Sequence, residues 1–302
     1  MEVLASTSAE PLHPAPPAAP QDSMACRQWA LWQELSDDLS PLLFTPHAHP
    51  DFLHALRVCA CQVMTLARLD ADVAIFHMVH ATDDKVNRYA TLHALHVGML
   101  MALVGLRKDW GDTRTLSGVQ AALTMNISVM ALQNDLALHH GPLDASQQRL
   151  IHAHPLASWQ QLRDLSVTDD DWLTAVAQHH EQADGSGYPQ GLNRLHHLAD
   201  ALRTCDVFGA KISPRAGRPG LLTPRAATEI FKQRSAGFGI GKINDHLAGL
   251  AARCGDFGDE RIEFGLTAGA DDDAGAFGDE PPDRGLDDGV PAVLAGGDVL
   301  LE

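Results

Sequence analysis

The sequence predicts an all-α protein, a helical bundle with a disordered N-terminal leader and an acidic C-terminal tail. Large apolar residues recur at three- and four-residue intervals from about residue 25 to residue 254, which is the period of amphipathic helices. Strict strand-like alternation is hard to find. Residues 1–24 are rich in Pro, Ala and Ser, and residues 255–302 are dominated by Gly, Asp and Pro, so neither end has the composition of a packed core.

The helical period justifies the individual elements in chain order. Asp144 precedes one helical run and Asp169 to Asp171 precede another, so these aspartates are the predicted N-caps. Helices are expected over residues 29–44, 51–79, 87–106, 116–138, 144–165, 169–180 and 247–254.

Charge is concentrated in the tail. The chain has a net charge of -17, and residues 255–302 hold 14 Asp or Glu against two Arg, a balance of -12 that leaves -5 for the rest. A strongly anionic protein is a poor partner for nucleic acid, but the nearly neutral body leaves room for a small phosphate ligand.

No membrane segment and no secretory signal are expected. The longest apolar run, Val97 to Leu106, is too short to span a bilayer, and the N-terminus has no basic segment followed by an apolar one. The expected location is therefore the cytoplasm.

The five cysteines form no C-x-x-C pair. An odd number without that spacing argues against a disulfide framework and against a zinc ribbon. They are expected to be buried thiols.

The segment "HHEQADGSGYP", residues 179–189, is the densest group of chemical side chains. Adjacent histidines before a glycine-rich turn are hard to explain by packing alone, so His179 and His180 are candidate metal ligands. Glu181 and Asp184 could form an acid-base pair; the preferred interpretation is that they orient the histidines and fix the turn. Gly185 and its neighbour at 187 are expected to serve backbone conformations with positive φ.

This segment closely resembles the signature of the HD-GYP proteins, a helical branch of the HD phosphohydrolase superfamily that linearises cyclic di-GMP. Three further segments match family motifs: "YATLHALHVGMLMA" with His93, "LIHAHPLAS" with His154, and "LADALRTCDVFGAK" with Asp206. The resemblance implies an HD-domain helical bundle over residues 89–254, preceded by an N-terminal helical region at 25–88. It also implies that these residues and the paired histidines are metal ligands.

One family motif is altered. Where the family reads approximately "AALLHDIGK", this chain reads "AALTMNISV". By the resemblance, Met125 replaces the histidine of the His-Asp doublet, Asn126 replaces the aspartate that bridges two ions, and Val129 replaces a lysine that contacts phosphate. Tyr89 stands where the family has a further acidic ligand. A thioether and a neutral amide are poor substitutes for these ligands.

The surviving ligands divide unequally between the two ions of the family. The first ion would retain only His93 and Asp206, while the second would retain His154, His179 and His180. Three histidines around an open position suffice for a catalytic zinc in unrelated enzymes. The sequence therefore leaves open one divalent ion of iron, manganese or zinc, or none.

The expected ligand is a cyclic dinucleotide or another small phosphate compound. Arg215 and Arg218 fall where the resemblance implies cationic contacts to the dinucleotide, and guanidinium groups match phosphate oxygens. Tyr188 is the family's contact in the Gly-Tyr-Pro loop. Lys211, one turn beyond Asp206, could replace the cation lost at Val129.

Three functions follow as hypotheses. The first is a degenerate HD-GYP protein of cyclic di-GMP signalling that binds a ligand or partner while hydrolysis is lost or weak. The second is an active phosphohydrolase with a single metal, and the third is a helical scaffold that docks a partner such as a diguanylate cyclase through the Gly-Tyr-Pro loop.

Overall fold

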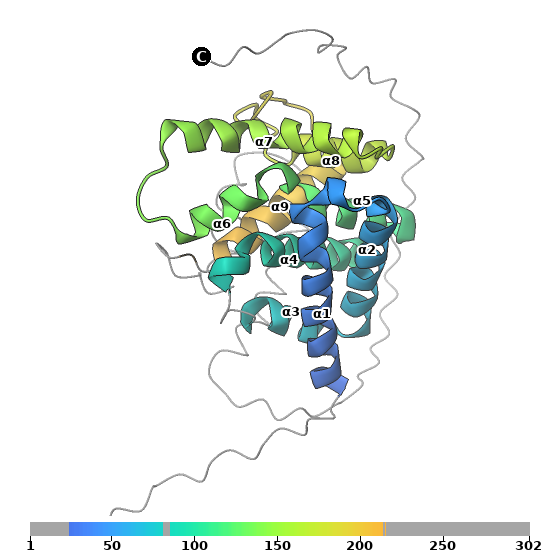
Figure 1. Cartoon of the computed structure of the whole chain (residues 1–302). Helices are drawn as coiled ribbons and strands as arrows, with labels where there is room; N and C mark the ends of the chain where they lie inside the picture. Colours follow the sequence, from blue (N-terminus) through green and yellow to red (C-terminus); the bar gives the residue numbers. More distant parts are fainter. Residues whose placement is uncertain (1–23, 81–84, 214, 216–302) are drawn as a thin grey trace, which may run out of the picture. The chain divides into compact units, whose positions relative to one another are not determined.

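The computed structural model describes residues 24–80, 85–213 and 215. Within these ranges the chain folds into helices without a β-strand, which confirms the all-α fold. The predicted leader up to residue 23, the predicted helix at 247–254 and the acidic tail lie outside the described residues. In chain order the helices are α1 (Met24–Phe44), η1 (Pro46–Ala48), α2 (Phe52–Leu69), α3 (Ala71–His80), α4 (Lys85–Arg107), α5 (Gly111–Thr124), η2 (Ile127–Val129), α6 (Met130–Leu138), α7 (Ala145–Asp164), α8 (Asp170–Gln178) and α9 (His197–Ile212) (Figure 1).

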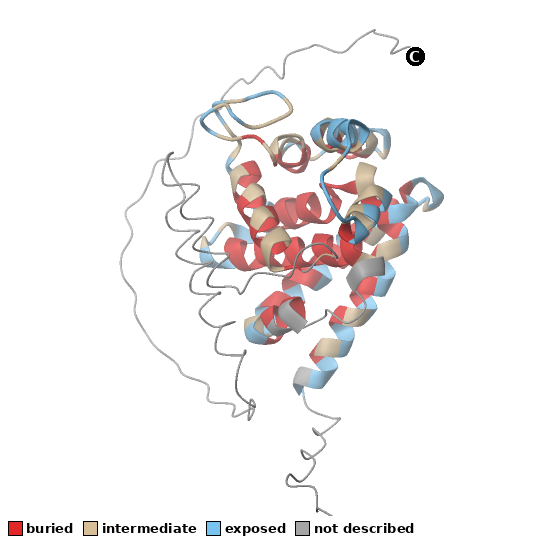
Figure 2. Ribbon diagram, turned by 90° about the vertical axis from the view of Figure 1, so that its left-hand side faces the viewer, coloured by how far each residue is buried: buried red, intermediate tan, exposed pale blue. Residues whose placement is uncertain are grey.

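Helix α4 lies at the centre of the bundle. It packs against α2, α5, α6 and α9, and Figure 2 shows the buried residues concentrated in this middle layer. Because α4 is apolar on nearly all sides, burial on all sides is the arrangement that removes its surface from water. The helix therefore presents His93 from the core of the protein rather than from its surface.

Three helical stretches are long and apolar enough to cross a membrane by length and composition: Phe52–Leu69, Tyr89–Arg107 and Gly111–Leu138. The sequence predicts none. In the apolar 18-residue window of each stretch, 94% of the residues in the second and 72% in the third are buried inside the structure, compared with 44% in the first. For the second and third stretches, their apolar composition is explained by the core they form.

Two of the predicted helical periods are each divided into shorter elements. The period at 51–79 breaks at Asp70, whose carboxylate accepts the backbone N–H groups of Asp72 and Val73 and so starts α3. The period at 116–138 breaks after Thr124, where Asn126 leaves helical geometry at φ -109° and ψ 13°. Apolar spacing continues across both breaks, so periodicity alone does not reveal them.

The predicted N-caps on α7 and α8 are confirmed. Asp144 accepts the N–H groups of Ser146 and Gln147, and the Gln147 side chain returns to the Asp144 N–H, which completes a capping box. Asp169 accepts the N–H of Trp172 at 3.0 Å. These caps fix where the two helices that carry the site histidines begin.

The described cysteines are not all buried. Cys59 and Cys205 are buried, but Cys26 and Cys61 are exposed because α1 and α2 turn only one face toward the core. The prediction of buried thiols is therefore wrong for Cys26 and Cys61.

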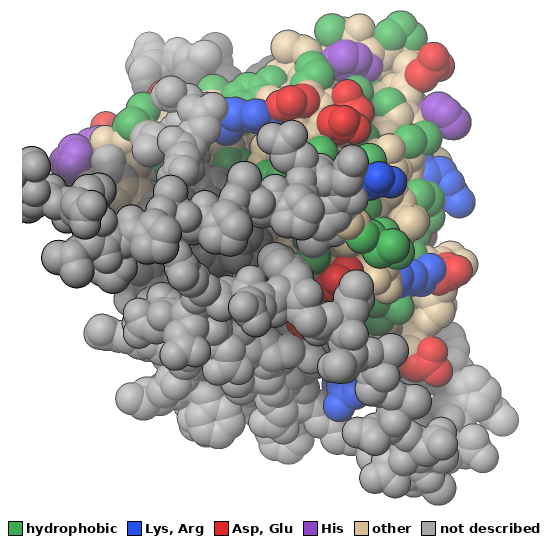
Figure 3. Space-filling view, turned by 90° about the horizontal axis from the view of Figure 1, so that it is seen from below, with side chains coloured by type: hydrophobic (Ala, Val, Ile, Leu, Met, Phe, Trp, Pro, Cys, Tyr) green, Lys and Arg blue, Asp and Glu red, His purple; other side chains and the backbone are tan. Residues whose placement is uncertain are grey.

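Where Figure 3 shows described residues, charges of both signs are interspersed with hydrophobic side chains on the surface.

Candidate metal and ligand site

A cavity of about 420 Å³ lies between α4, α6, α7, α9 and the loop after α8. A volume of this size is in the range of small-molecule sites. His179 lies beneath it, fully buried, and Arg218 lies outside the described residues. The cavity is lined by most of the residues that the sequence singles out: His93, Asn126, Val129, His154, His180, Tyr188, Asp206, Lys211 and Arg215.

The orientation of His154 follows from the proline beside it. In a regular helix the carbonyl of Ile151 would accept the N–H of residue 155, but Pro155 has no N–H. The free carbonyl accepts the Nδ1–H of His154 instead, at 2.6 Å. The ring is thereby fixed as the tautomer whose Nε2 carries a lone pair.

His179 is fixed in the same way by the end of a helix. Helix α8 ends at Gln178, so the carbonyl of Val176 belongs to the last turn, whose carbonyls lack partners within the helix. This carbonyl accepts the Nδ1–H of His179 at 2.6 Å. The Nε2 of His179 therefore also carries a lone pair.

The two Nε2 atoms of His154 and His179 face each other at 3.0 Å. Burial lowers the pKa of His154 to about 3, aided by His179, and burial likewise lowers the pKa of His179. Both rings are therefore neutral near pH 7, and neither has a proton to place between the two lone pairs. A bound cation would satisfy both nitrogens at once.

His180 completes a group of three. One ring nitrogen of each of His154, His179 and His180 lies within 4.8 Å of the others, and this is the only such group of three or more metal-ligating side chains among the described residues. The pKa of His180 lies well below its ordinary value. Burial is the largest cause, and the neighbouring His179 lowers this pKa further. Three neutral imidazoles suit zinc, iron or manganese, so the residues present fit one divalent ion.

His93 and Asp206 are also brought together, but they bond to each other. Nε2 of His93 lies 2.8 Å from Oδ1 of Asp206. Burial raises the pKa of Asp206, yet the hydrogen bond and charge of His93 outweigh it and hold the carboxyl pKa well below its ordinary value. The pair offers two ligands at most, and Asp206 is 4.0 Å from Nδ1 of His180.

The altered motif lies partly in the core and partly on the cavity wall. Met125 is fully buried in the apolar core and does not line the cavity, whereas Asn126 and Val129 do. The hydroxyl of Ser128 contacts that of Ser158 at 2.8 Å and donates to the carbonyl of His154 at 3.3 Å. The segment is therefore well packed, although it supplies no carboxylate and no cation to the cavity.

The carboxylates of the signature segment organise its loop. Glu181 is fully buried and accepts the N–H groups of Gln190 and Leu192 at 2.6 and 2.9 Å. Asp184 is exposed and accepts both the N–H and the hydroxyl of Ser186. They fix the turn as expected, but the Nδ1 atoms of His154 and His179 are oriented by backbone carbonyls rather than by these carboxylates.

The two glycines of the loop serve different needs. Gly185 has φ +77°, which confirms the expectation of a left-handed conformation. Gly187 does not have positive φ. A Cβ on Gly187 would lie 2.3 Å from the backbone nitrogen of Gln182 and 2.4 Å from Cα of Glu181, so glycine is required there by close approach of two chain segments.

Tyr188 lies against the histidine cluster. Its ring stacks on His180 with centroids 4.6 Å apart and on His152 with centroids 4.4 Å apart. Burial raises the pKa of Tyr188, so the phenol is neutral at ordinary pH. The loop therefore contributes an aromatic wall to the cavity.

Arg215 is held by Tyr89, a residue that stands out in the sequence only because the family has an acidic metal ligand at this position. Its Nε and Nη2 donate to the Tyr89 hydroxyl at 3.1 and 2.6 Å, and its guanidinium carbon is 4.8 Å from the centre of the Tyr89 ring. The two residues are 126 positions apart. No local pattern signals such a pair, so sequence reasoning missed it.

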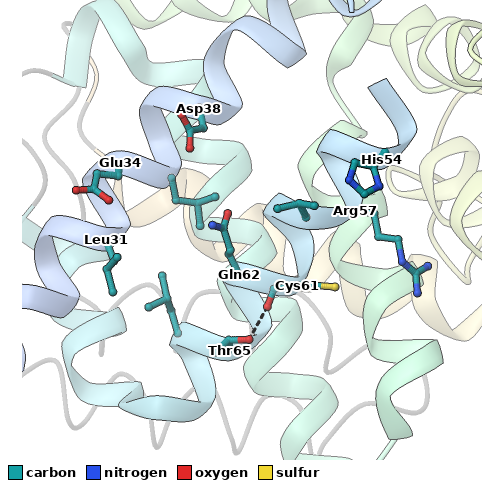
Figure 4. Close-up of a pocket in the computed structure, with 11 residues that line it drawn as sticks. Leu31, Glu34, Asp38, His54, Arg57, Cys61, Gln62 and Thr65 are labelled. Carbon is teal, nitrogen blue, oxygen red and sulfur yellow. Dashed lines mark hydrogen bonds between the residues drawn. The ribbon is translucent and has the colours of Figure 1, made fainter. Parts of the chain in front are cut away.

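A second cavity, of about 530 Å³, lies between α1 and α2 (Figure 4). Its walls are partly apolar, with Glu34 and Asp38 on α1 and His54 and Arg57 on α2. It is larger than the first cavity, but the only three-histidine group of the described residues lies elsewhere. Candidate phosphate chemistry therefore belongs to the smaller cavity.

Comparisons with known proteins identify a matching domain family and two related phosphodiesterases. The family described as HD domain matches residues 76–238. The chain is 27% identical over 190 residues to a 3'3'-cGAMP-specific phosphodiesterase of Vibrio cholerae, which covers 59% of this chain and 41% of that protein. It is also 27% identical over 136 residues to a cyclic di-GMP phosphodiesterase of Pseudomonas aeruginosa, which covers 44% of this chain and 33% of that protein.

A solved structure has the same fold. A protein of Bdellovibrio bacteriovorus described as an HDG"Y"P protein superimposes with a TM-score of 0.61 at 15% identity, over 78% of this chain and 75% of that chain. The chain spans less than half the length of the two curated phosphodiesterases. Since the family match covers more than half of the chain and the Gly-Tyr-Pro loop is present, the chain belongs to the HD domain family and to its HD-GYP branch.

Proposed function

We propose that this chain is a degenerate HD-GYP protein that binds cyclic di-GMP or a related cyclic dinucleotide in the cytoplasm, with phosphodiesterase activity lost or severely weakened. The observation that carries the proposal is a contrast at one site: a complete three-histidine cluster at His154, His179 and His180, and an amide at Asn126 on the cavity wall where a bridging carboxylate would be needed.

Binding is supported by the charge and walls of the cavity. Lys211 and Arg215 line it, and the carboxylate of Asp206 is occupied by its hydrogen bond with His93. These cationic groups match the phosphate oxygens of a phosphodiester. A divalent ion held by the three histidines would add a Lewis acid for a phosphate oxygen.

Loss of turnover is supported by what the chain lacks around that cluster. Asn126 is neutral and cannot bridge two cations as a carboxylate does, and Val129 places an apolar side chain on the cavity wall. His93 and Asp206 would offer a second ion two donors at most, too few for tight binding.

A second candidate is a hydrolase with a single metal, which the histidine cluster itself favours. Three histidines around an open position are enough for zinc catalysis in unrelated enzymes. This reading requires metal-dependent hydrolysis that His179→Ala abolishes. A scaffold that docks a diguanylate cyclase through the Gly-Tyr-Pro loop would instead tolerate loss of the histidines and be sensitive to changes at Tyr188.

The experiment that separates these functions combines binding and turnover. The purified protein is incubated with cyclic di-GMP and manganese, iron or zinc, the linear product pGpG is followed by chromatography, and binding is measured by calorimetry. The proposal expects binding with little or no pGpG. Linearisation at the rate of an intact HD-GYP enzyme assayed in parallel would refute it, and absence of binding would leave the scaffold function as the better account.

A further inference from the structure

Tyr89 and Arg215 form a pair within the ligand cavity. Two N–H groups of the guanidinium, on Nε and Nη2, are directed at the phenol oxygen, and the guanidinium also lies over the ring. An arginine has five N–H donors, and the bonds to Tyr89 use two of them; no other described residue is seen to accept the remaining three. Both residues line the cavity, which places those donors where a ligand would bind.

Tyr89 is itself rigidly held. It follows a kink in α4 at Arg88, which has φ -123° and is anchored to Ser36 and Asp37 of α1 by hydrogen bonds of 3.0 and 2.5 Å. Its ring is 3% exposed and stacks on His93 with centroids 5.7 Å apart and planes within 6°. The phenol oxygen is thus a fixed point to which the long side chain of Arg215 can be attached.

The contacts continue from this pair to the histidine cluster. His93, beneath Tyr89, bonds to Asp206, and Asp206 is 4.0 Å from His180. The guanidinium therefore lies at one end of a continuous series of cavity residues, and the three-histidine cluster lies at the other. A ligand in the cavity can therefore meet the guanidinium at one end and the histidines at the other.

The identity of residue 89 matters for charge. A carboxylate at this position would neutralise Arg215 through an ion pair, whereas a phenol orients the guanidinium without cancelling its charge. An oriented cation that needs no rearrangement binds an anion more strongly than a mobile one. The substitution of an acidic ligand by tyrosine thus removes a metal ligand and supplies an anchor for arginine.

We propose that Tyr89 is a positioning residue that holds Arg215 as a fixed cation for a ligand phosphate in this cavity. The cation supplies positive charge in the half of the site where too few ligands remain for an ion. This inference rests on the proposed function only in placing an anion in this cavity; the pair and its geometry do not depend on cyclic di-GMP.

A double-mutant cycle tests the proposal on the full chain. Binding of two probes, cyclic di-GMP and inorganic phosphate, is measured by calorimetry for the wild type, Tyr89→Phe, Arg215→Ala and the double variant, with metal content determined on each sample. Tyr89→Phe removes one oxygen and keeps the packing. Arg163→Lys, at an exposed arginine on α7, is the matched control.

The cycle has distinct expected values. Tyr89→Phe weakens binding about tenfold and Arg215→Ala about a hundredfold, as for loss of a charge-assisted contact. The double variant binds no more weakly than Arg215→Ala, because the hydroxyl acts through the guanidinium. Metal content stays at the wild-type value, and Arg163→Lys changes nothing.

Each failure has its own meaning. Unchanged binding in Tyr89→Phe, additive losses in the double variant, or no binding of either probe by the wild type would overturn the inference. If cyclic di-GMP binds with the same affinity to the wild type and to the Tyr89 and Arg215 variants, the inference is wrong but the proposed function is still supported. Tyr89-dependent binding of phosphate without binding of cyclic di-GMP supports the inference and refutes the proposed function.

Discussion

Nε2 of His154 and Nε2 of His179 face each other at 3.0 Å, each on a ring whose Nδ1–H is donated to a backbone carbonyl. The carbonyl of Ile151 is free because Pro155 follows one turn later, and that of Val176 is free because α8 ends there. Backbone geometry alone thus prepares both nitrogens as ligands. Disturbing that backbone should disturb metal binding without touching a ligand.

Pro155→Ala tests this relationship. The new N–H would compete with His154 for the carbonyl of Ile151, so we expect metal affinity to fall about tenfold, as for loss of an orienting partner, while the helix gains a backbone hydrogen bond. Affinity is measured by competition with a chelator. Pro41→Ala, at a proline inside helix α1, is the control and should leave metal affinity unchanged. Equal affinity in Pro155→Ala and wild type would contradict the account.

The stability of the metal-free protein should depend on the protonation of His154. Burial and then His179 lower the pKa of this ring from 6.5 to about 3, so the folded state excludes a proton that the unfolded chain binds. Stability is full above pH 6.5 and falls as the pH decreases toward 3. One such ring accounts for a loss of about 2 kcal/mol between pH 7 and pH 5.

Urea unfolding at both pH values measures this loss. His154→Gln removes the titrating group and should show a smaller pH dependence than the wild type. His139→Gln, at an exposed histidine outside the site, should retain the full dependence. If the wild type and His154→Gln have the same dependence, the burial of a neutral ring is not its cause.

The two carboxylates of the loop should differ in their contribution to stability. Glu181→Gln replaces a buried acceptor of two N–H groups, and we expect a loss of about 1–3 kcal/mol in the free energy of unfolding. Asp184→Asn changes an exposed turn residue and should lower the free energy of unfolding by less than Glu181→Gln does. Denaturant unfolding of both variants measures the difference, and equal losses would argue against a structural role for Glu181.

Substitutions at Met125 and Asn126 of the altered motif should have different effects, because Met125 lies in the core and Asn126 lines the cavity. Met125→His places a polar ring in the apolar core and is expected to destabilise the protein by about 1–3 kcal/mol. Asn126→Asp adds a carboxylate to the cavity wall and should raise metal affinity about tenfold or more. Chelator competition and urea unfolding on both variants test the division, which fails if Asn126→Asp gains no affinity.

Much of the fold and part of the site could be predicted from the sequence. Helical periodicity predicts the all-α bundle, and the aspartates at 144 and 169 predict the starts of α7 and α8. The resemblance predicts which histidines meet, because His154 and His179 belong to motifs with fixed roles. Local signals and family motifs both act within short stretches, and these features need nothing longer.

The remaining features depend on tertiary contacts or on backbone geometry. The pairing of Tyr89 with Arg215 joins positions 126 residues apart and leaves no mark on either local pattern. The need for glycine at Gly187 arises from the passage of another chain segment, not from its own φ. Likewise, the breaks at Asp70 and Asn126 interrupt helices without interrupting the apolar period.

The most direct test of the central claim is the number of divalent ions bound per chain, determined by elemental analysis after loading with zinc, manganese or iron and removal of free metal. The account predicts one ion in the wild type, none in His179→Ala and one in His139→Ala. Two ions per wild-type chain, or none, would contradict it.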